Sequence, residues 1–401
     1  MSDQANSQEL QPLRPSLAVR LGVVSFLNDC SSEILSRALP LFLTTGLGLS
    51  PLVLGLIEGI SETVSIVVNG LSGWISDRME SRKPLVVLGY SLSALSRSLM
   101  FFTAVAPLVV LARVADRFGK GVRTAPRDAL IADGSREGKV GESFGIARSL
   151  DTIGAVTGLS LAIYFGLGHA DMTASLFQWM LLMSVPFAWL ASLTALIWIP
   201  RFQRLTKARV AIAWHIPNEI KPLIFAIAIF SLGASSDAFL VLRAREIGFD
   251  FAEILMLFIC FNILASVVGW LAGVMSDRFG RYRFLLVGWF VYALCYLAMG
   301  RASTTTEFVV AFTTYGAFYG LTDGVEKAFL ADLLPVRKRG LGYGVFQMVL
   351  ACIAIPANML TGYFATQYGL TSALQISGFF AFAGLVVLVI VRPKLKIPTK
   401  K

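Results

Sequence analysis

Two apolar stretches of the chain contain ionisable side chains spaced four residues apart. The first carries Asp29, Glu33 and Arg37, and the second carries Glu58 and Glu62. In an α-helix, residues four apart lie on one face. Carboxyl groups crowded in a low-dielectric environment cannot all stay ionised, so they can take up and release protons. The four acids are candidates for proton coupling or substrate contact, unless permanent ion pairs with basic residues only hold the helices together.

A third apolar stretch, residues 107–132, carries the most charge. Six of its seven charged residues, all but Asp128, recur at the spacing of one helix face; they are Arg113, Asp116, Arg117, Lys120, Arg123 and Arg127. A helix with such a stripe cannot face lipid, so we expect it to line a central cavity or to pair with neighbouring helices. Lys120 either neutralises one of the acids Asp29, Glu33 and Glu62 or binds an anionic substrate.

The remaining candidates lie in segments with fewer charges. Arg148 and Asp151 lie three residues apart in one apolar segment, and Asp237 and Tyr319 lie in two others. We expect these side chains to contact the substrate or the proton path. Both histidines lie between apolar segments, which argues against a histidine proton relay. The four cysteines show no metal-ligand spacing, and we expect them to be free and buried.

The composition identifies the elements that must position these residues. The chain has 401 residues, of which 56% are hydrophobic and 15% charged, and its mean hydropathy is +0.70; a soluble protein carries about 25% charged residues. The apolar residues form blocks long enough to cross a bilayer, without strand-like alternation. We predict an all-α membrane protein with about twelve transmembrane helices. Their ranges are 17–46, 52–72, 84–105, 107–132, 141–166, 174–199, 222–247, 252–275, 284–301, 307–334, 341–368 and 372–391.

The basic residues predict how the chain lies in the membrane. The net charge is +10, and Lys and Arg gather in alternate loops, which is typical of cytoplasmic loops. We therefore place both termini in the cytoplasm of a plasma membrane, the inner membrane of a bacterium. The expected units are a cytoplasmic tail (1–16), a six-helix bundle (17–199), a cytoplasmic linker (200–221), a second six-helix bundle (222–391) and a basic cytoplasmic tail (392–401).

The two halves of the chain repeat each other. The loop Gly73–Lys83 has a second copy at Gly273–Arg283, and the run Ala129–Asp133 has one at Ala328–Asp332. Duplicated six-helix units place a substrate site near the middle of the membrane, between the halves. Glu326 and Lys327 align with Arg127 and Asp128 with opposite signs, which suggests interlocking ion pairs that act as a gate.

These features resemble the major facilitator superfamily over the whole chain. The pattern G-x-x-x-D-R-x-x-x-R-K at 73–83 and its echo at 273–283 match the superfamily's loop signature, although Glu80 and Ser81 stand where a Gly is common. The resemblance implies two pseudo-symmetric bundles and identifies Arg113 as the superfamily's arginine beside a proton-coupling acid. It also implies a gate made of Gly73, Asp77, Arg78, Arg82, Arg127, Asp128, Gly273, Asp277, Arg278, Glu326 and Lys327.

The resemblance further implies how this gate works. Asp77 and Arg78 would latch the cytoplasmic helix ends while the cavity faces outward, with Asp77 near the positive helix start around Gly340. In the segment 141–166, drug antiporters of the superfamily usually carry a Gly-Pro-rich motif. This chain keeps Gly154 and Gly158 but lacks the proline.

The function expected from these observations is proton-coupled secondary transport by alternating access. No phosphate-binding loop of the G-x-x-x-x-G-K-[ST] type occurs, so ATP is not the energy source. The first interpretation is an antiporter that exports a small organic or drug-like molecule. The second is proton-driven uptake of an anionic metabolite or ferric siderophore. The third is a receptor or scaffold without transport. We expect a monomer that is no enzyme, with no cofactor, metal or nucleic-acid partner.

Overall fold

The computed structural model describes residues 16–102, 105–135, 140–167, 172–200, 216–335 and 339–395. These residues are almost entirely helical and include no strand, as predicted. The helices are α1 (Leu17–Leu41), α2 (Pro51–Ser76), α3 (Lys83–Leu99), α4 (Ala106–Asp133), α5 (Val140–Gly166), α6 (Ala174–Trp198), α7 (Lys221–Leu232), α8 (Asp237–Ile247), α9 (Phe251–Phe279), α10 (Arg281–Arg301), α11 (Thr305–Asp332) and α12 (Arg339–Val391), with short π and 3₁₀ turns at Phe42–Gly46 and Arg392–Lys394.

The prediction of one continuous helix at 222–247 is wrong, because the chain breaks between α7 and α8. At the break, Gly233 packs so closely that an added Cβ would lie 2.7 Å from the backbone nitrogen of Ala381. Ser236 then starts α8, since its side chain accepts a hydrogen bond from the backbone of Ala238 at 3.2 Å. Side chains satisfy the backbone groups that the break frees: Tyr292 donates to the carbonyl of Gly233 at 2.9 Å, and the N–H of Ser236 donates to Asn358 at 2.8 Å.

The two helices predicted at 341–368 and 372–391 are the two parts of α12, which is interrupted between them. They meet at Gly369, whose φ of 82° and ψ of 162° interrupt the helix, a backbone conformation that glycine adopts easily. If α7 and α8 count as one interrupted helix and α12 as two, the described residues form twelve rod-like segments. Seven spans, with α7–α8 and α12 each counted once, are long and apolar enough to cross a membrane.

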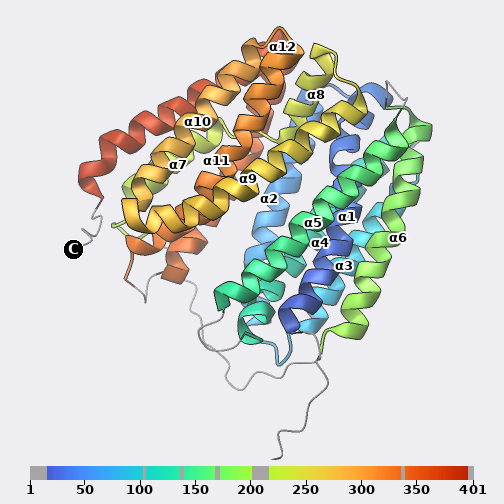
Figure 1. The fold of residues 1–401 in the computed structure, drawn as a ribbon, viewed down its shortest axis with the longest axis horizontal. Coiled ribbons are helices and arrows are strands. Elements are labelled where there is room, and N and C mark those ends of the chain that lie inside the picture. Colours follow the sequence, from blue (N-terminus) through green and yellow to red (C-terminus); the bar gives the residue numbers. More distant parts are fainter. Residues whose placement is uncertain are drawn as a thin grey trace, which may run out of the picture.

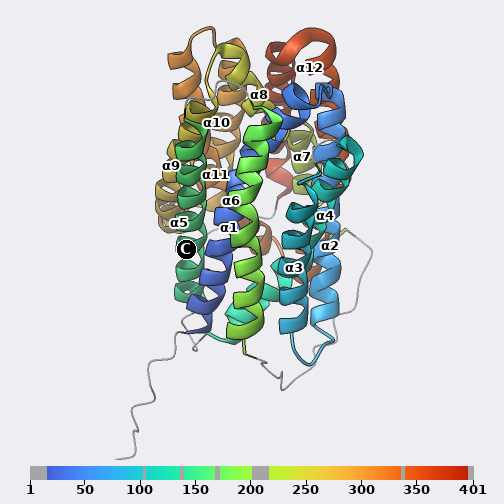
Figure 2. The same ribbon diagram turned by 90° about the vertical axis from the view of Figure 1, so that its right-hand side faces the viewer.

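The helices form two groups (Figure 1). Helices α1 to α6 pack with one another, with α1 against α5 and α6 and with α4 against α2 and α3. Helices α7 to α12 form the second group, in which α11 packs against α9 and α10. In Figure 2 the helices run roughly from the top to the bottom of the view. We call the end that carries the loop after α2 and the loop after α9 the motif end, and the opposite end the far end.

The two groups meet closely at the far end. Helix α2 packs against the first part of α12, where an added Cβ on Gly59 would lie 2.8 Å from the Cα of Ile355. Thr63 donates a hydrogen bond to the carbonyl of Ala351 at 2.8 Å. On the other side of the molecule, α5 ends against the start of α9, where Gly166 contacts Phe251. Both seams therefore close the far end.

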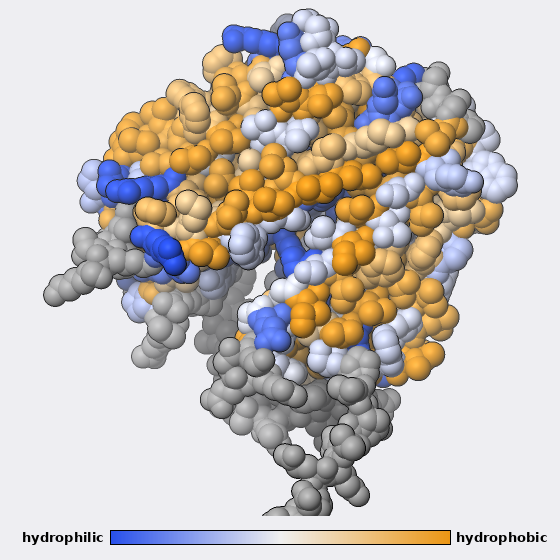
Figure 3. All heavy atoms as spheres, in the orientation of Figure 1, coloured by the Kyte–Doolittle hydropathy of each residue, from blue (hydrophilic) through white to orange (hydrophobic). Residues whose placement is uncertain are grey.

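At the motif end the two groups separate. Figure 3 shows a cleft between them that opens towards the lower edge of the view, with hydrophilic side chains inside and a largely hydrophobic outer surface. A cavity of about 710 Å³ lies in this region, between α5, α9 and α11. The described residues therefore form a bundle that is closed at one end and open at the other.

The four cysteines only partly follow the expectation. All are free: Cys30 and Cys295 are buried, whereas Cys260 and Cys352 are exposed. The prediction of burial is wrong for the latter two, because the outer faces of α9 and α12 are apolar and accept a thiol as readily as the core does.

Several expectations lie outside the described residues. They concern the tail 1–15, most of the linker (201–215), the last residues 396–401, both histidines (His169 and His215) and the basic residues Arg136, Lys139, Arg337 and Lys338.

Candidate functional site

Glu58 of α2 and Arg113 of α4 form a buried ion pair. The guanidinium donates three hydrogen bonds to the carboxylate, at 2.9 to 3.1 Å, and both side chains are only 7% exposed. Ser236 donates a further hydrogen bond to Glu58 at 3.2 Å, and its backbone N–H donates to Asn358 at 2.8 Å. This pair therefore also joins the first helix group to α8 and α12.

Arg37 of α1 lies between two carboxylates from different halves of the chain. It contacts Glu33 of its own helix at 3.5 Å and donates to Asp237 of α8 at 3.2 Å. Its guanidinium also stacks 3.7 Å from the ring centroid of Phe258. Asp237 accepts a second hydrogen bond from the hydroxyl of Tyr315 at 3.2 Å. The arrangement holds α1 to α8 near the far end.

Asp116 and Arg123 of the α4 stripe connect α4 to α3. Asp116 pairs with the buried Arg97 at 3.1 Å. Arg123 donates to the hydroxyl of Ser93 at 2.6 Å and lies 4.7 Å above the ring of Tyr90. Arg97 is buried, so its need for a buried carboxylate explains why Asp116 lies opposite it.

Arg127, at the end of the stripe, connects α4 to α1 and α5. Arg127 contacts the neighbouring Asp128 at 3.1 Å and Asp151 of α5 at 3.4 Å. It also donates to Ser25 of α1 at 2.6 Å. Asp116, Arg123, Arg127 and Asp151 thus hold the first helix group together in this conformation, whatever further part they have in transport.

Four charged side chains of α1, α2 and α4 have neither an ion pair nor a hydrogen bond to another helix among the residues that the structure describes. We call Asp29, Glu62, Arg117 and Lys120 the central cluster. Lys120 and Glu62 are exposed, and the Nε of Arg117 is buried without a hydrogen-bond partner. Asp29 accepts a hydrogen bond from Asn28 at 3.0 Å. Lys120 lies within electrostatic range of the other three. Since charges avoid lipid, we infer that the exposed members face the cleft.

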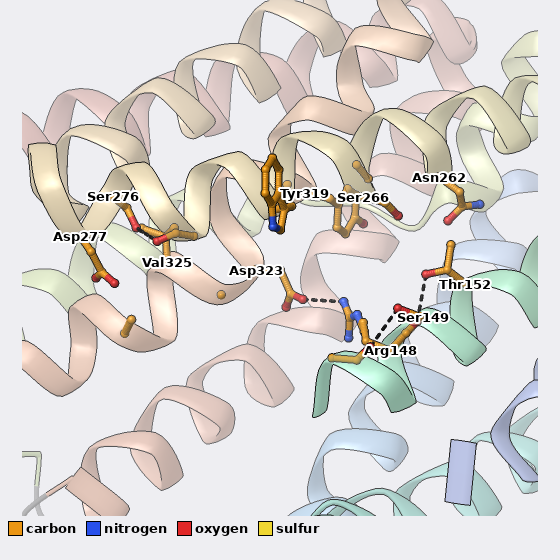
Figure 4. A pocket seen from close by; sticks show the side chains of 18 of the residues that line it. Arg148, Ser149, Thr152, Asn262, Ser266, Ser276, Asp277, Tyr319, Asp323 and Val325 are labelled. Atoms are coloured by element: carbon orange, nitrogen blue, oxygen red, sulfur yellow. Dashed lines mark hydrogen bonds and ion pairs between the residues drawn. The ribbon is translucent and has the colours of Figure 1, made fainter. Parts of the chain in front are cut away.

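The cavity at the motif end contains an ion pair between the two groups. Arg148 of α5 donates to Asp323 of α11 at 2.7 Å, and Lys327 contacts the same carboxylate at 3.1 Å. Figure 4 shows Arg148 and Asp323 pointing towards each other, with Tyr319 further along the wall. Tyr319 packs edge to face on Phe261, with ring centroids 5.3 Å apart. Polar and aromatic side chains therefore share this cavity.

In this conformation, whose motif end is open, Arg127 and Asp128 form no ion pair with Glu326 or Lys327 among the described residues. Arg127 keeps its partners inside the first helix group, and Lys327 binds Asp323 one turn away on α11. Glu326 is half-buried. The ion pair that crosses the cleft is Arg148–Asp323, because these two lie on facing helices while Arg127 points towards α5.

The two repeated loops form equivalent networks. In each, one arginine bridges the loop aspartate and an aspartate at the end of a later helix. The first set is Arg82 with Asp77 at 2.9 Å and Asp133 at 3.3 Å, and the second is Arg281 with Asp277 at 2.8 Å and Asp332 at 2.6 Å. Each network ties the loop after one helix to the end of another within the same half.

The other residues of the loops lie on the surface of the motif end. Arg78 folds back to donate to the carbonyl of Trp74 at 3.0 Å and stacks on its ring. Gly73 faces Ala125 of α4, where an added Cβ would lie 3.2 Å from the alanine Cβ. Gly273 has open space around it, and Arg278 is exposed. The surroundings of Gly340, the expected partner of Asp77, lie outside the described side chains.

Some residues of the site were not among the candidates. Asp323, Ser236, Asn358 and Arg97 take part in the contacts above. A charged residue inside an apolar segment was the available signal for Asp323 and Arg97. No comparable signal marks Ser236 or Asn358, because neutral polar residues are frequent in membrane helices.

The sequence matches known proteins over most of its length. A sequence model described as Major Facilitator Superfamily matches residues 21–242 and 223–401. A curated relative, an uncharacterized MFS-type transporter of Methanocaldococcus jannaschii, is 33% identical over 354 residues, which cover 86% of this chain and 87% of the relative. A probable 4-methylmuconolactone transporter of Cupriavidus pinatubonensis is 31% identical over 85 residues, 21% of this chain and 20% of that protein.

Solved structures share the fold at low sequence identity. The nucleoside transporter NupG superimposes with a TM-score of 0.74 at 15% identity, covering 95% of this chain and 100% of that one. A POT family transporter in complex with 5-aminolevulinic acid gives a TM-score of 0.78 at 12% identity, covering 95% of this chain and 96% of that one. At this identity the likeness concerns the arrangement of helices alone.

Proposed function

Because the chain belongs to the major facilitator superfamily, we propose that it is a proton-coupled secondary transporter of small organic molecules. It is an integral membrane protein of a transporter family, and alternating access accounts for its shape. The observation that carries the proposal is the asymmetry of the bundle. The seams α2–α12 and α5–α9 are closed at the far end, while the charged cleft is open at the motif end.

The proposal assigns the motif end to the cytoplasm. Basic residues concentrate in its loops, which is the pattern of cytoplasmic loops. The cleft then faces the cytoplasm in this conformation, and the rocking of the two six-helix bundles would open the far end to the outside. In that second conformation the loops at Asp77 and Asp277 would come together and act as the gate.

The proton carriers that we favour are Glu62 and Asp29. Glu58 is held by three hydrogen bonds from Arg113, so protonation of Glu58 would leave a buried, unpaired guanidinium. Glu62 and Asp29 have no cation within ion-pair distance among the described residues, and Glu62 is exposed. A proton can therefore bind either of them at a smaller electrostatic cost.

The direction of transport gives two candidate functions. Export of a drug-like molecule by proton antiport follows from the first interpretation of the sequence. Uptake of an anionic metabolite or ferric siderophore is the second, and the unpaired cations Arg117 and Lys120 favour it. Growth of a deletion strain separates the two, since drug sensitivity indicates export and failure on limiting nutrient or iron indicates uptake.

The test of proton coupling uses purified protein in proteoliposomes under an imposed pH gradient. We expect substrate flux together with proton movement, reported by a dye inside the vesicles. Glu62→Gln should uncouple flux from the gradient, whereas the control Glu253→Gln, which preserves a helix cap on the far end, should behave like wild type. If no compound of a broad panel moves with the gradient, the protein is a receptor or scaffold and the proposal fails.

A further inference from the structure

Arg117 and Lys120 differ from the other cations of α4, each of which has an ion pair or, for Arg123, a hydrogen bond to Ser93. They lie three residues apart, so they share one face of the helix. Arg113 has its own carboxylate, and Arg127 has two. In contrast, no ion pair or hydrogen bond to the side chains of Arg117 and Lys120 occurs in the described part of the chain.

The nearby carboxylates do not satisfy these two cations. Glu58 is within electrostatic range of Arg117 but is already bound by Arg113. Glu62 and Asp29 attract Lys120 from a distance beyond ion-pair contact. A buried guanidinium nitrogen without an acceptor is costly, and two adjacent cations repel each other. An anion that enters from the cleft would relieve both costs at once.

The cavity between α5, α9 and α11 forms a second, aromatic part of the arrangement. The acids and the base on one face of α1 connect the two parts, since Asp29 lies near Lys120 and Arg37 lies near Tyr319. These α1 residues are eight apart, which is about 12 Å along a helix. Tyr319 is 40% exposed and packs on Phe261, and both line the cavity. The cationic pair and the aromatic wall thus lie near positions of α1 that are about 12 Å apart along the helix.

From this arrangement we propose that Arg117 and Lys120 bind the anionic group of an organic acid whose apolar or aromatic body lies against Phe261 and Tyr319. The proposal deepens the proposed function and rests on it for the transport of this ligand. The carboxylate would accept hydrogen bonds from the Lys120 ammonium and from the unsatisfied Arg117 guanidinium. A neutral or cationic analogue would leave both groups unpaired and would bind weakly.

The test measures binding to the purified full-length protein by isothermal titration calorimetry. The probes are benzoate, 2-naphthoate and indole-3-acetate, each compared with its neutral amide. We expect binding of at least one carboxylate, with an affinity about tenfold or more above that of its amide, the difference that a charged hydrogen bond supplies. Absence of binding by all three carboxylates, or equal binding of the amides, would overturn the proposal.

Variants assign the binding to the two cations. Lys120→Met and Arg117→Gln should each weaken the bound carboxylate about tenfold or more, and Lys120→Arg should restore most of the affinity. The matched controls, Lys394→Met and Arg283→Gln, make the same changes at exposed positions away from the cleft and should bind as wild type. Unchanged binding in the Lys120→Met, Arg117→Gln double variant, or failure of Lys120→Arg to bind, contradicts the proposal.

The outcome is separable from that of the proposed function. Binding that depends on Lys120, with no gradient-driven flux of the bound acid, leaves the site in place and removes the transport claim. Gradient-driven flux of neutral compounds alone, without carboxylate binding, supports the transport claim and removes the anion site.

Discussion

The buried pair of Glu58 and Arg113 makes a quantitative prediction for Glu58→Gln. The substitution keeps the shape of the side chain but removes the charge that three hydrogen bonds from Arg113 satisfy. Both side chains are 7% exposed, so solvent screens the loss very little. Breaking one partner of a buried ion pair costs about 3–5 kcal/mol, and we expect the free energy of unfolding to fall by that amount.

The comparison with Glu62→Gln isolates the cause. Glu62 lies one turn away on the same helix, is exposed and has no ion pair among the described residues, so its substitution should change the free energy of unfolding by less than about 1 kcal/mol. Replacing both partners, Glu58→Gln with Arg113→Met, removes the uncompensated cation. The double variant should therefore be more stable than Glu58→Gln alone.

The assay is reversible unfolding of the purified protein in mixed micelles of a mild detergent and dodecyl sulfate, followed by far-ultraviolet circular dichroism. The reasoning is refuted if Glu58→Gln is as stable as Glu62→Gln. It is also refuted if the double variant loses the sum of the two single losses, since the two side chains would then act independently.

Three further predictions concern the gate and the seams. Asp77→Asn should lower flux in proteoliposomes with little change in substrate Kd, and a change in Kd alone would move Asp77 from the gate to the binding site. Arg148→Asp should slow transport, and adding Asp323→Arg should restore part of the rate. Because Arg148 is 74% exposed, the free energy of unfolding should change by less than about 1 kcal/mol in each variant. A double variant that transports no faster than Arg148→Asp argues against a gate. Gly59→Leu should force the backbone at Ile355 away, since even a Cβ would lie 2.8 Å from its Cα. The variant should therefore lose transport, which is measured by flux and by labelling of cysteines placed at the far end. Wild-type flux in this variant would contradict a closed seam.

The hydropathy of the sequence was sufficient to predict the helices. The segment 141–166 corresponds to α5 at Val140–Gly166, and the segment 307–334 corresponds to α11 at Thr305–Asp332, because blocks of apolar residues are long enough to identify individually. The break at Gly233 could not be predicted, since it depends on how closely α12 approaches. The local sequence shows which residues tolerate a break in the helix, but not that packing against α12 imposes one.

The choice of partners in the site was less predictable. Glu58 and Glu62 are the same residue type on one helix face, yet Glu58 is buried against Arg113 and Glu62 is exposed. Helical spacing places both on α2 but gives no information on which one meets α4. The division of the α4 stripe into paired and unpaired cations depends on Glu58 and Asp151, which come from two other helices.

The glycines along the seam between α2 and α12 have a kinetic consequence. Where backbone meets backbone, as at Gly59 and Gly362, no flexible side chain can stretch to maintain contact while the helices part. Dispersion attraction fades within about 1 Å of separation, so the contacts along the seam are lost nearly together. Opening of the far end should then be all-or-none, with one activation barrier and no partly open intermediate.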